Sequence, residues 1–335
     1  MRYTRRELGR MALAAIPAAG IVGTPALFAR QAKPNSKVRG VTIGMNVPYN
    51  FGPGPNTPPR GAALGSGRDA PVDEIIQHCV TLGVSGVELR TQPVESFLGA
   101  PTQPLGAGGG QRGRGAAPTP EQLAASAAAA AELQKWRLSA SMAQVRALRR
   151  RFEDAGVLIE IVKVDDIFDM PDAVVDYQFE LARNLGARAI STEIADEGPR
   201  RLGRFADKHK LMVGYHGHAE TSMANFESLF GYAAHNGANL DIGHFVAGQN
   251  TSPLPFMQRH HTRITHIHVK DRKLNGGPNM PFGQGDTPIK EVLQAIRDNR
   301  WNIQATIEFE YPVPAGSDRM TELKRCVDYC RAALA

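Results

Sequence analysis

The feature that most constrains the fold is a repeated alternation of short apolar runs, rich in Val and Ile, with longer segments of helical periodicity. We expect eight strands, at residues 41–47, 83–90, 158–164, 187–194, 211–216, 239–244, 264–269 and 304–310. The segments between them predict helices, among them residues 71–82, 122–155, 172–185, 225–235 and 289–299, with a last helix from Arg319. The repeated order of strand and then helix predicts a parallel sheet, and eight such units match a closed (β/α)8 TIM barrel of the α/β class. An open, doubly wound sheet is the alternative.

Two stretches do not follow this alternation. Residues 1–32 begin with the paired Arg5 and Arg6, followed by an apolar run that is too short and too rich in Ala and Gly for a membrane span. This pattern is typical of a twin-arginine export signal, so we expect a periplasmic or secreted protein with no stable membrane span in its mature form. An uncleaved N-terminal anchor is the alternative. Residues 97–122 are dense in Gly, Ala and Pro and predict a surface insertion within a single barrel domain at 38–335.

Charge and cysteine content argue against nucleic-acid binding and against a structural zinc site. Residues 1–32 carry five Arg and one Glu, so the formal net charge of +6 falls to +2 without them, and the sequence predicts no nucleic-acid binding. Of the three cysteines, Cys326 and Cys330 lie one turn apart on one predicted helix, where a disulfide has poor geometry. We expect Cys79 in the core, and no cysteine spacing is typical of a structural zinc site.

Polar side chains gather where the expected strands end. The active site of a TIM barrel lies at the carboxyl ends of its strands, so residues there are candidates for chemistry. These residues are Glu88, Glu193, His216, His218, Asp241, His244, His268, Lys270, Glu308 and Glu310. Carboxylates that converge in one cavity repel one another unless a cation is bound. Carboxylates and imidazoles without thiolates suit Mn²⁺, Mg²⁺, Co²⁺ or Zn²⁺.

Three motifs among these residues are specific enough to suggest a family. They are Asp241-x-x-His244, His268-x-Lys270-Asp271, and a Gly-x-Gly-Asp turn at Gly283, Gly285 and Asp286. With "GVELR" and "IEFE", they make the chain from residue 40 onward resemble the sugar phosphate isomerase/epimerase family, which has the xylose isomerase-like TIM barrel. The resemblance implies Asp241, His268 and Glu308 as metal ligands, with His244 and Lys270 contacting substrate oxygens. Mn²⁺ is the ion we expect first.

One position departs from the pattern of that family, in which a Glu on the fifth strand supplies a fourth ligand. Here the sequence reads "YHGH", with His216 at that position and His218 two residues later. Either His216 is the fourth ligand, or Glu193 from the neighbouring strand supplies the missing carboxylate. We favour Glu193, because two acidic and two imidazole ligands would make a softer site than the family's oxygen-rich one.

The resemblance implies chemistry through an enediolate, in which a metal ion holds the carbonyl and an adjacent hydroxyl of a sugar while a neighbouring carbon loses its proton. Glu310 or Glu88 is the expected general base, His218 or His244 would orient the oxygens, and Lys270 would hold negative charge. We therefore expect an isomerase or epimerase that acts on an unphosphorylated sugar or sugar derivative, since sugar phosphates are scarce outside the cytoplasm.

Other functions stay open at this point. The first alternative is a lyase or dehydratase that eliminates from a keto-sugar or 3-keto-glycoside, because the same enediolate can expel a leaving group. A non-catalytic exported sugar-binding barrel and a phosphodiesterase of the endonuclease-four type are further alternatives. The expected partner is a small sugar, and the sequence leaves open a homo-oligomer and a functional partnership with a sugar oxidoreductase.

Overall fold

The structure is a computed structural model of the chain and describes residues 32–52, 70–101 and 119–335. The chain divides into two units, Met1–Ala32 and Lys33–Ala335. The predicted export signal, apart from Ala32, and residues 102–118 of the predicted insertion lie outside the described residues. Within the described part of the chain, no helix has the length and apolar character needed to cross a membrane.

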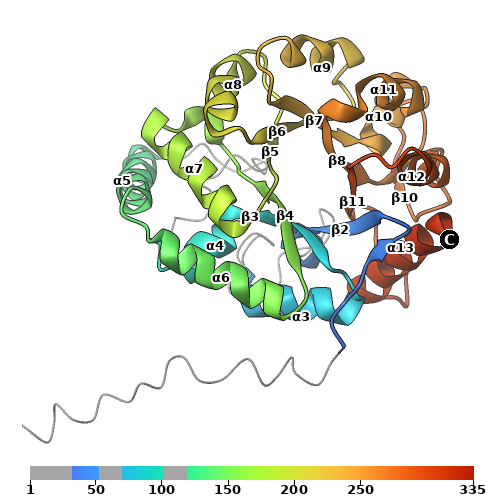
Figure 1. Ribbon diagram of the computed structural model, residues 1–335, viewed down its shortest axis with the longest axis horizontal. Helices are drawn as coiled ribbons and strands as arrows, with labels where there is room; N and C mark the ends of the chain where they lie inside the picture. The colour runs from blue at the N-terminus through green and yellow to red at the C-terminus, as the bar shows by residue number, and fades with distance from the viewer. Residues whose placement is uncertain (1–31, 53–69, 102–118) are drawn as a thin grey trace, which may run out of the picture. The chain divides into compact units, whose positions relative to one another are not determined.

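Eight parallel strands close into a barrel in the unit Lys33–Ala335 (Figure 1). They are β2 (Val41–Val47), β3 (Gly86–Arg90), β4 (Leu158–Lys163), β5 (Ala189–Glu193), β6 (Met212–His216), β7 (Asn236–Asp241), β8 (Ile264–Val269) and β11 (Gln304–Ile307). Each strand pairs in parallel with the next, and β2 closes the ring by pairing with both β3 and β11. A short strand, β1 (Lys37–Val38), adds to β2 in the antiparallel direction. The predicted TIM barrel is confirmed, and the open sheet is excluded.

Helices surround the barrel (Figure 1). They are α3 (Val72–Leu82), α4 (Thr91–Phe97), α5 (Pro120–Arg137), α6 (Met142–Asp154), α7 (Asp172–Leu185), α8 (Gly198–His209), α9 (Met223–Phe230), α10 (Ile242–Gln249), α11 (Leu254–His260), α12 (Ile289–Asp298) and α13 (Arg319–Leu334). The single helix predicted at 122–155 is therefore two. The second, α6, begins at Met142, and the hydroxyl of the N-cap residue Ser141 accepts a hydrogen bond from the backbone N–H of Gln144.

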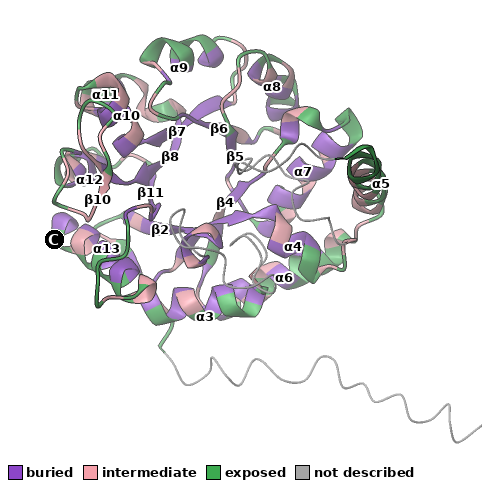
Figure 2. Cartoon of the chain, turned by 180° about the vertical axis from the view of Figure 1, so that it is seen from behind, coloured by how far each residue is buried: buried purple, intermediate pink, exposed green. Residues whose placement is uncertain are grey.

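The barrel strands carry apolar side chains outward and polar side chains inward. On β8, Ile267 and Val269 alternate with His266 and His268, and all four are buried. His268 hydrogen-bonds to Glu88 on β3, which is not a neighbour of β8 in the ring, so these two side chains meet inside the barrel. Figure 2 shows the strands as the most continuously buried part of the molecule. The hydrophobic core therefore lies between strands and helices, and the interior is left for polar groups.

A turn beside the barrel explains the Gly-x-Gly-Asp motif. The strands β9 (Asp271–Arg272) and β10 (Asn279–Met280) form a small antiparallel hairpin after β8. The Asp271 carboxylate accepts hydrogen bonds from the backbone N–H groups of Gly283 at 2.8 Å, Gly285 at 2.9 Å and Thr287 at 3.2 Å. A Cβ at Gly285 would lie 1.9 Å from Asp271 Oδ1, so only glycine fits there. Asp271 thus ties residues 283–287 to the hairpin.

We predict that Asp271→Ala destabilises the fold by about 2–4 kcal/mol, because it leaves three backbone donors without their acceptor. The measurement is the free energy of unfolding in urea. Asp286→Ala is the matched control, since Asp286 bonds Lys273 and the N–H of Leu274 at the exposed surface and should matter much less. Equal losses in the two variants would contradict this account of the turn.

Candidate metal centre

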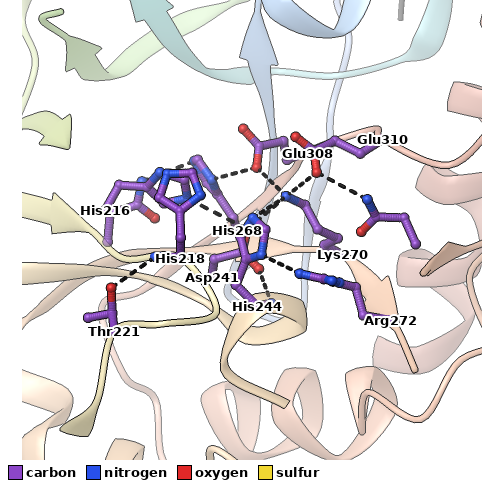
Figure 3. Close-up of polar contacts among 12 residues, drawn as sticks. His216, His218, Thr221, Asp241, His244, His268, Lys270, Arg272, Glu308 and Glu310 are labelled. Carbon is purple, nitrogen blue, oxygen red and sulfur yellow. Dashed lines mark hydrogen bonds and ion pairs between the residues drawn. The ribbon is translucent and has the colours of Figure 1, made fainter. Parts of the chain in front are cut away.

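Four side chains converge at the carboxyl ends of four successive barrel strands. His216 ends β6, Asp241 ends β7, His268 lies near the end of β8 and Glu308 follows β11. Each offers one nitrogen or oxygen atom, and these atoms all lie within 4.8 Å of one another. All four residues are buried, and Figure 3 shows their side chains turned toward a common centre. We refer to them as the four-residue cluster.

The atoms that face this centre make no hydrogen bond, although two of them lie within ion-pair distance of the Lys270 ammonium. They are His216 Nε2, Asp241 Oδ2, His268 Nδ1 and Glu308 Oε2. They contact one another instead, with 3.6 Å between His216 Nε2 and Asp241 Oδ2, and 3.2 Å between His268 Nδ1 and Glu308 Oε2. Buried polar atoms are rarely left without a partner. Two carboxylate oxygens and two imidazole nitrogens aimed at one point fit a divalent cation.

Each imidazole of the cluster donates its outer N–H to a carboxylate. His268 Nε2 donates to Glu88 Oε2 at 2.6 Å, and His216 Nδ1 donates to Glu193 Oε2 at 3.1 Å. Such partners fix the orientation of a ring and leave the lone pair of its other nitrogen free to bind a metal. Glu88 and Glu193 therefore lie one hydrogen bond behind the cluster. Each forms a further group of potential ligand atoms, Glu88 with His266 and His268, and Glu193 with His216 and His218.

The outer oxygens of the two cluster carboxylates are also held. Asp241 Oδ1 accepts the backbone N–H of His244 at 2.7 Å, so Asp241 is the N-cap of α10 as well as a member of the cluster. Glu308 Oε1 accepts a hydrogen bond from Asn46 Nδ2 at 2.9 Å. Each carboxylate thus has one oxygen fixed by the fold and one oxygen turned inward.

Glu193 is held on its other side by a lysine. The buried ammonium of Lys163, at the end of β4, donates to Glu193 Oε1, while Glu193 Oε2 receives His218 Nε2 at 3.0 Å in addition to His216. Burial raises the pKa of Glu193, but Lys163 and His216 outweigh it, so the pKa lies below its usual range. The structure therefore places Glu193 beside the four-residue cluster, and it places His216 within it.

Lys270 follows β8 and supplies the positive charge nearest to the cluster. Its buried Nζ lies 3.1 Å from Asp241 Oδ2, 2.9 Å from Glu308 Oε2 and 2.6 Å from Glu310 Oε2 (Figure 3). Burial lowers the pKa of Lys270, but these three carboxylates outweigh it and hold the pKa well above its ordinary value. The side chain is therefore an ammonium that forms ion pairs with three carboxylates and also lies 3.1 Å from His244 Nε2.

Glu310 lies at the edge of the cluster. Besides Lys270, its carboxylate accepts hydrogen bonds from the Tyr49 hydroxyl at 2.7 Å and from Asn279 Nδ2 at 3.3 Å. Burial and the charge of Glu308 raise the pKa of Tyr49, so the phenol stays a donor. Sequence reasoning found Glu310 but missed Tyr49, which lies two residues after the end of β2.

The remaining candidate histidines lie at different depths. The His244 side chain is 12% exposed and has Lys270 at one ring nitrogen and Arg272 at the other. Burial lowers the pKa of His244 to about 4. His218 is 46% exposed and lies farther out, bonded to Glu193. His266 is buried deeper in the barrel, with Nδ1 2.9 Å from the hydroxyl of Thr265.

Sequence reasoning missed five polar residues around the cluster. They are Asn46, Tyr49, Lys163, Arg272 and Asn279. Asn46 and Lys163 stand at the ends of β2 and β4, so the rule that selected the other residues could have found them. Tyr49, Arg272 and Asn279 come from loops and the hairpin, where no periodicity in the sequence gives their direction.

Comparison with known proteins identifies the type of barrel. Residues 191–332 match the family model described as xylose isomerase-like TIM barrel. The chain has the xylose isomerase-like fold. No sequence among the curated proteins matches the chain. The matched region includes β6, β7, β8 and β11, the strands that carry the four-residue cluster.

Solved structures agree with this barrel type at low sequence identity. A D-psicose 3-epimerase with D-tagatose, from Clostridium cellulolyticum H10, is 11% identical with a TM-score of 0.56, covering 88% of this chain and 99% of that chain. The probable 3-DHS dehydratase AsbF from Bacillus anthracis is 14% identical with a TM-score of 0.54, covering 86% and 98%. A xylose isomerase-like TIM barrel protein from Mycobacterium smegmatis, in complex with magnesium, is 14% identical with a TM-score of 0.51, covering 88% and 98%. These likenesses concern the fold.

We predict that Glu88→Gln weakens binding of a divalent cation by about 10-fold to 100-fold, because a neutral amide supports the His268 ring less well than a carboxylate does. The measurement is calorimetric titration with Mn²⁺. Glu95→Gln is the control, since Glu95 is also a buried carboxylate and pairs with Arg137 at 2.8 Å instead of with a cluster residue. Unchanged affinity in Glu88→Gln would show that the hydrogen bond from His268 to Glu88 does not affect the metal affinity of the cluster.

Proposed function

We propose that the protein is a divalent-metal-dependent isomerase or epimerase that forms an enediolate from an unphosphorylated sugar or sugar derivative. The observation that carries this proposal is the set of four buried, inward-facing atoms without hydrogen bonds at the carboxyl ends of the barrel strands. An epimerase, a dehydratase and a magnesium complex among proteins of the same fold support an enzyme with a metal. Export to the periplasm or beyond, and supply of substrate by a sugar oxidoreductase, stay predictions from the sequence.

We propose His216, Asp241, His268 and Glu308 as the residues that would hold the metal. Mn²⁺ is the ion we expect first, with Mg²⁺, Co²⁺ or Zn²⁺ as alternatives. A bound ion would act as a Lewis acid on neighbouring carbonyl and hydroxyl oxygens. His216 is now favoured as the fourth ligand, because its Nε2 faces the centre while both oxygens of Glu193 already accept hydrogen bonds from Lys163, His216 and His218.

The residues around Lys270 are suited to proton transfer next to a carbonyl group. Glu310 is the candidate base, because its carboxylate lies at the edge of the cluster and is only partly buried. It would accept the proton of the carbon next to the carbonyl and return it to the same or the neighbouring carbon. The Lys270 ammonium, 2.6 Å from Glu310 Oε2, would stabilise the negative charge that develops on substrate oxygen.

A lyase or dehydratase is the second candidate function, and one observation favours it. Epimerisation removes a proton from one face of a carbon and adds a proton to the other face. It therefore needs an acid or base on each face. Here an imidazole, His216, stands where the sequence pattern leads us to expect a second carboxylate, and Glu193 is paired with Lys163. Elimination needs one base and one acid, which Glu310 and Lys270 could provide.

The test of enediolate formation is proton exchange in D₂O. The Mn²⁺-loaded protein is incubated with a panel of free sugars and 3-keto sugars, and deuterium incorporation is followed by NMR. We expect incorporation at the carbon next to the carbonyl in at least one substrate, with an isomer or epimer as product. An unsaturated product with loss of water or of an aglycone would assign the lyase instead. Binding without exchange across the panel would favour a sugar-binding barrel.

Metal content of variants tests the ligand assignment. We predict that Asp241→Ala, His268→Ala and His216→Ala each lose stoichiometric metal, since each removes one of four donor atoms, while the circular dichroism spectrum is retained. Glu193→Gln should still bind one equivalent at saturating Mn²⁺, with lower affinity, because its carboxylate only orients His216. If Glu193→Gln loses the metal while His216→Ala keeps it, Glu193 is the fourth ligand.

A further inference from the structure

A cavity of about 350 Å³ lies between two loops that follow barrel strands. One loop leads from β5 to α8, and the other leads from β6 to α9. The two strands pair with Glu193 beside His216, and Figures 1 and 2 both show α8 next to α9. Both loops leave the carboxyl ends of their strands, so the cavity lies at the same face of the barrel as the four-residue cluster.

Glu193 and His218 connect this cavity to the cluster. The Glu193 carboxylate bonds both His216 of the cluster and His218, and the side chains of Glu193 and His218 are 48% and 46% exposed. Ile194, which follows Glu193, lines the cavity. The backbone N–H of His218 donates to the hydroxyl of Thr221, another lining residue, at 3.1 Å (Figure 3). A ligand that contacts both the cluster and the cavity would pass over this exposed pair.

The far wall of the cavity is held in place by contacts between α8 and α9. The Arg200 guanidinium lies over the ring of Tyr232, 4.2 Å from its centroid, and Arg200 Nε is 3.6 Å from Glu197 Oε2. The Tyr232 hydroxyl lies 3.2 Å from Ser228 Oγ, one turn earlier on α9. Glu197, Ser228 and Tyr232 all line the cavity. The wall is therefore formed before any ligand binds.

The cavity presents polar groups whose capacity for hydrogen bonds is not used. The carboxylates of Asp196 and Glu220 form no hydrogen bond or ion pair with a described residue. The buried hydroxyl of Thr221 accepts from His218 but donates to no group in the described part of the chain. Carboxylates only accept hydrogen bonds, whereas hydroxyls both donate and accept. The cavity thus favours a ligand that is rich in donors and also carries acceptors.

Three other kinds of ligand fit this lining less well. Asp196, Glu197 and Glu220 would repel an anionic group. A wholly apolar group would remove these carboxylates from water without offering them a hydrogen bond. A metal ion needs ligand atoms that converge, and among the described residues these three carboxylates form no such group, unlike the four-residue cluster. A neutral group with several hydroxyls fits the cavity best.

We propose that this cavity is a second sugar subsite, which binds a neutral sugar ring joined to the sugar that reacts at the cluster. The substrate class is then a disaccharide or a similar glycoside, and this inference rests on the proposed function for the reacting sugar. Ligand cavities measure about 300–1,000 Å³, so one of about 350 Å³ suits a single ring. The ring hydroxyls would donate to Asp196 and Glu220 and bond Thr221, and its C–H groups would pack against Leu229 and Tyr232.

Calorimetric titration of the full chain, loaded with Mg²⁺, tests the subsite. The probes are cellobiose, maltose, lactose and trehalose, with glucose as the single-ring reference. We expect at least one disaccharide to bind about 10-fold or more tightly than glucose, because the second ring adds hydrogen bonds to charged groups. The matching disaccharide with a uronic acid as its second ring should lose this advantage, since its carboxylate would face Asp196 and Glu220.

Two variants and a control locate the binding of the second ring. Ser228→Trp fills the cavity from α9, and the double variant Asp196→Asn with Glu220→Gln removes two charges from its lining. Each should lower the affinity for the preferred disaccharide by about 10-fold or more and leave the affinity for glucose unchanged. Met223→Trp is the matched control, because Met223 is exposed on the same helix and does not line the cavity. It should leave both affinities unchanged.

Several outcomes would overturn the inference. They are no disaccharide that binds more tightly than glucose, a preference that survives both variants, an equal loss in Met223→Trp, or tighter binding of a cationic amino-sugar disaccharide than of any neutral one. Should Ser228→Trp fail to fold, the double variant decides, since Asp196 and Glu220 are exposed.

Failure of the proposed function gives a different result. Disaccharides would then bind with the expected preference, and the variants would weaken that binding, but no sugar would exchange deuterium. Exchange with single-ring sugars and no preference for a second ring would leave the proposed function in place and refute the subsite.

Discussion

Buried negative charge is the constraint on which the rest of the site depends. Asp241 and Glu308 are almost fully buried, and Glu310 lies against the same ammonium, so three carboxylates share Lys270. Carboxylates at such short separation cannot all stay ionised without compensation. One ammonium does not compensate three carboxylates, and burial of His268 lowers its pKa while Glu308 and Glu88 outweigh it and raise the pKa to about 10. A bound divalent cation would compensate the same negative charge.

The side chains of the cluster each serve the fold with one atom and the site with another. Asp241 caps α10 with Oδ1, and Glu308 accepts from Asn46 with Oε1, while their second oxygens face the centre. Each imidazole likewise has one ring nitrogen bonded to a carboxylate, Glu88 for His268 and Glu193 for His216, while its other nitrogen faces the centre. Because every outer atom is bonded, the inner atoms keep their direction without a ligand present, so little reorganisation is needed on binding.

The barrel and most of the residues at its strand ends could be predicted from the sequence, because successive side chains of a strand point alternately to its two faces. The choice between His216 and Glu193 could not. Both end neighbouring strands, and their contacts differ because Lys163, on a third strand, pairs with Glu193. Tyr49 and Glu310 meet across 261 positions of sequence, and Arg272 reaches His244 only through the bend of a hairpin. Such contacts depend on the closed ring and have no local pattern.

The two sides of the cluster differ in chemistry. Toward β8 and β11 lie Lys270, Glu308 and Glu310, which can exchange protons and hold charge on oxygen. Toward β5 and β6 lie His216 and His218, both bonded to a carboxylate that Lys163 already neutralises. A substrate carbon between these sides would meet a carboxylate base on one face and imidazoles on the other. Under the proposed function, Glu310 would set the face from which a proton leaves, and the fate of the proposed enediolate would depend on whether His218, at the exposed rim, can deliver a proton to the opposite face. An enzyme in which it can is an epimerase, and one in which it cannot is left with isomerisation along one face or elimination.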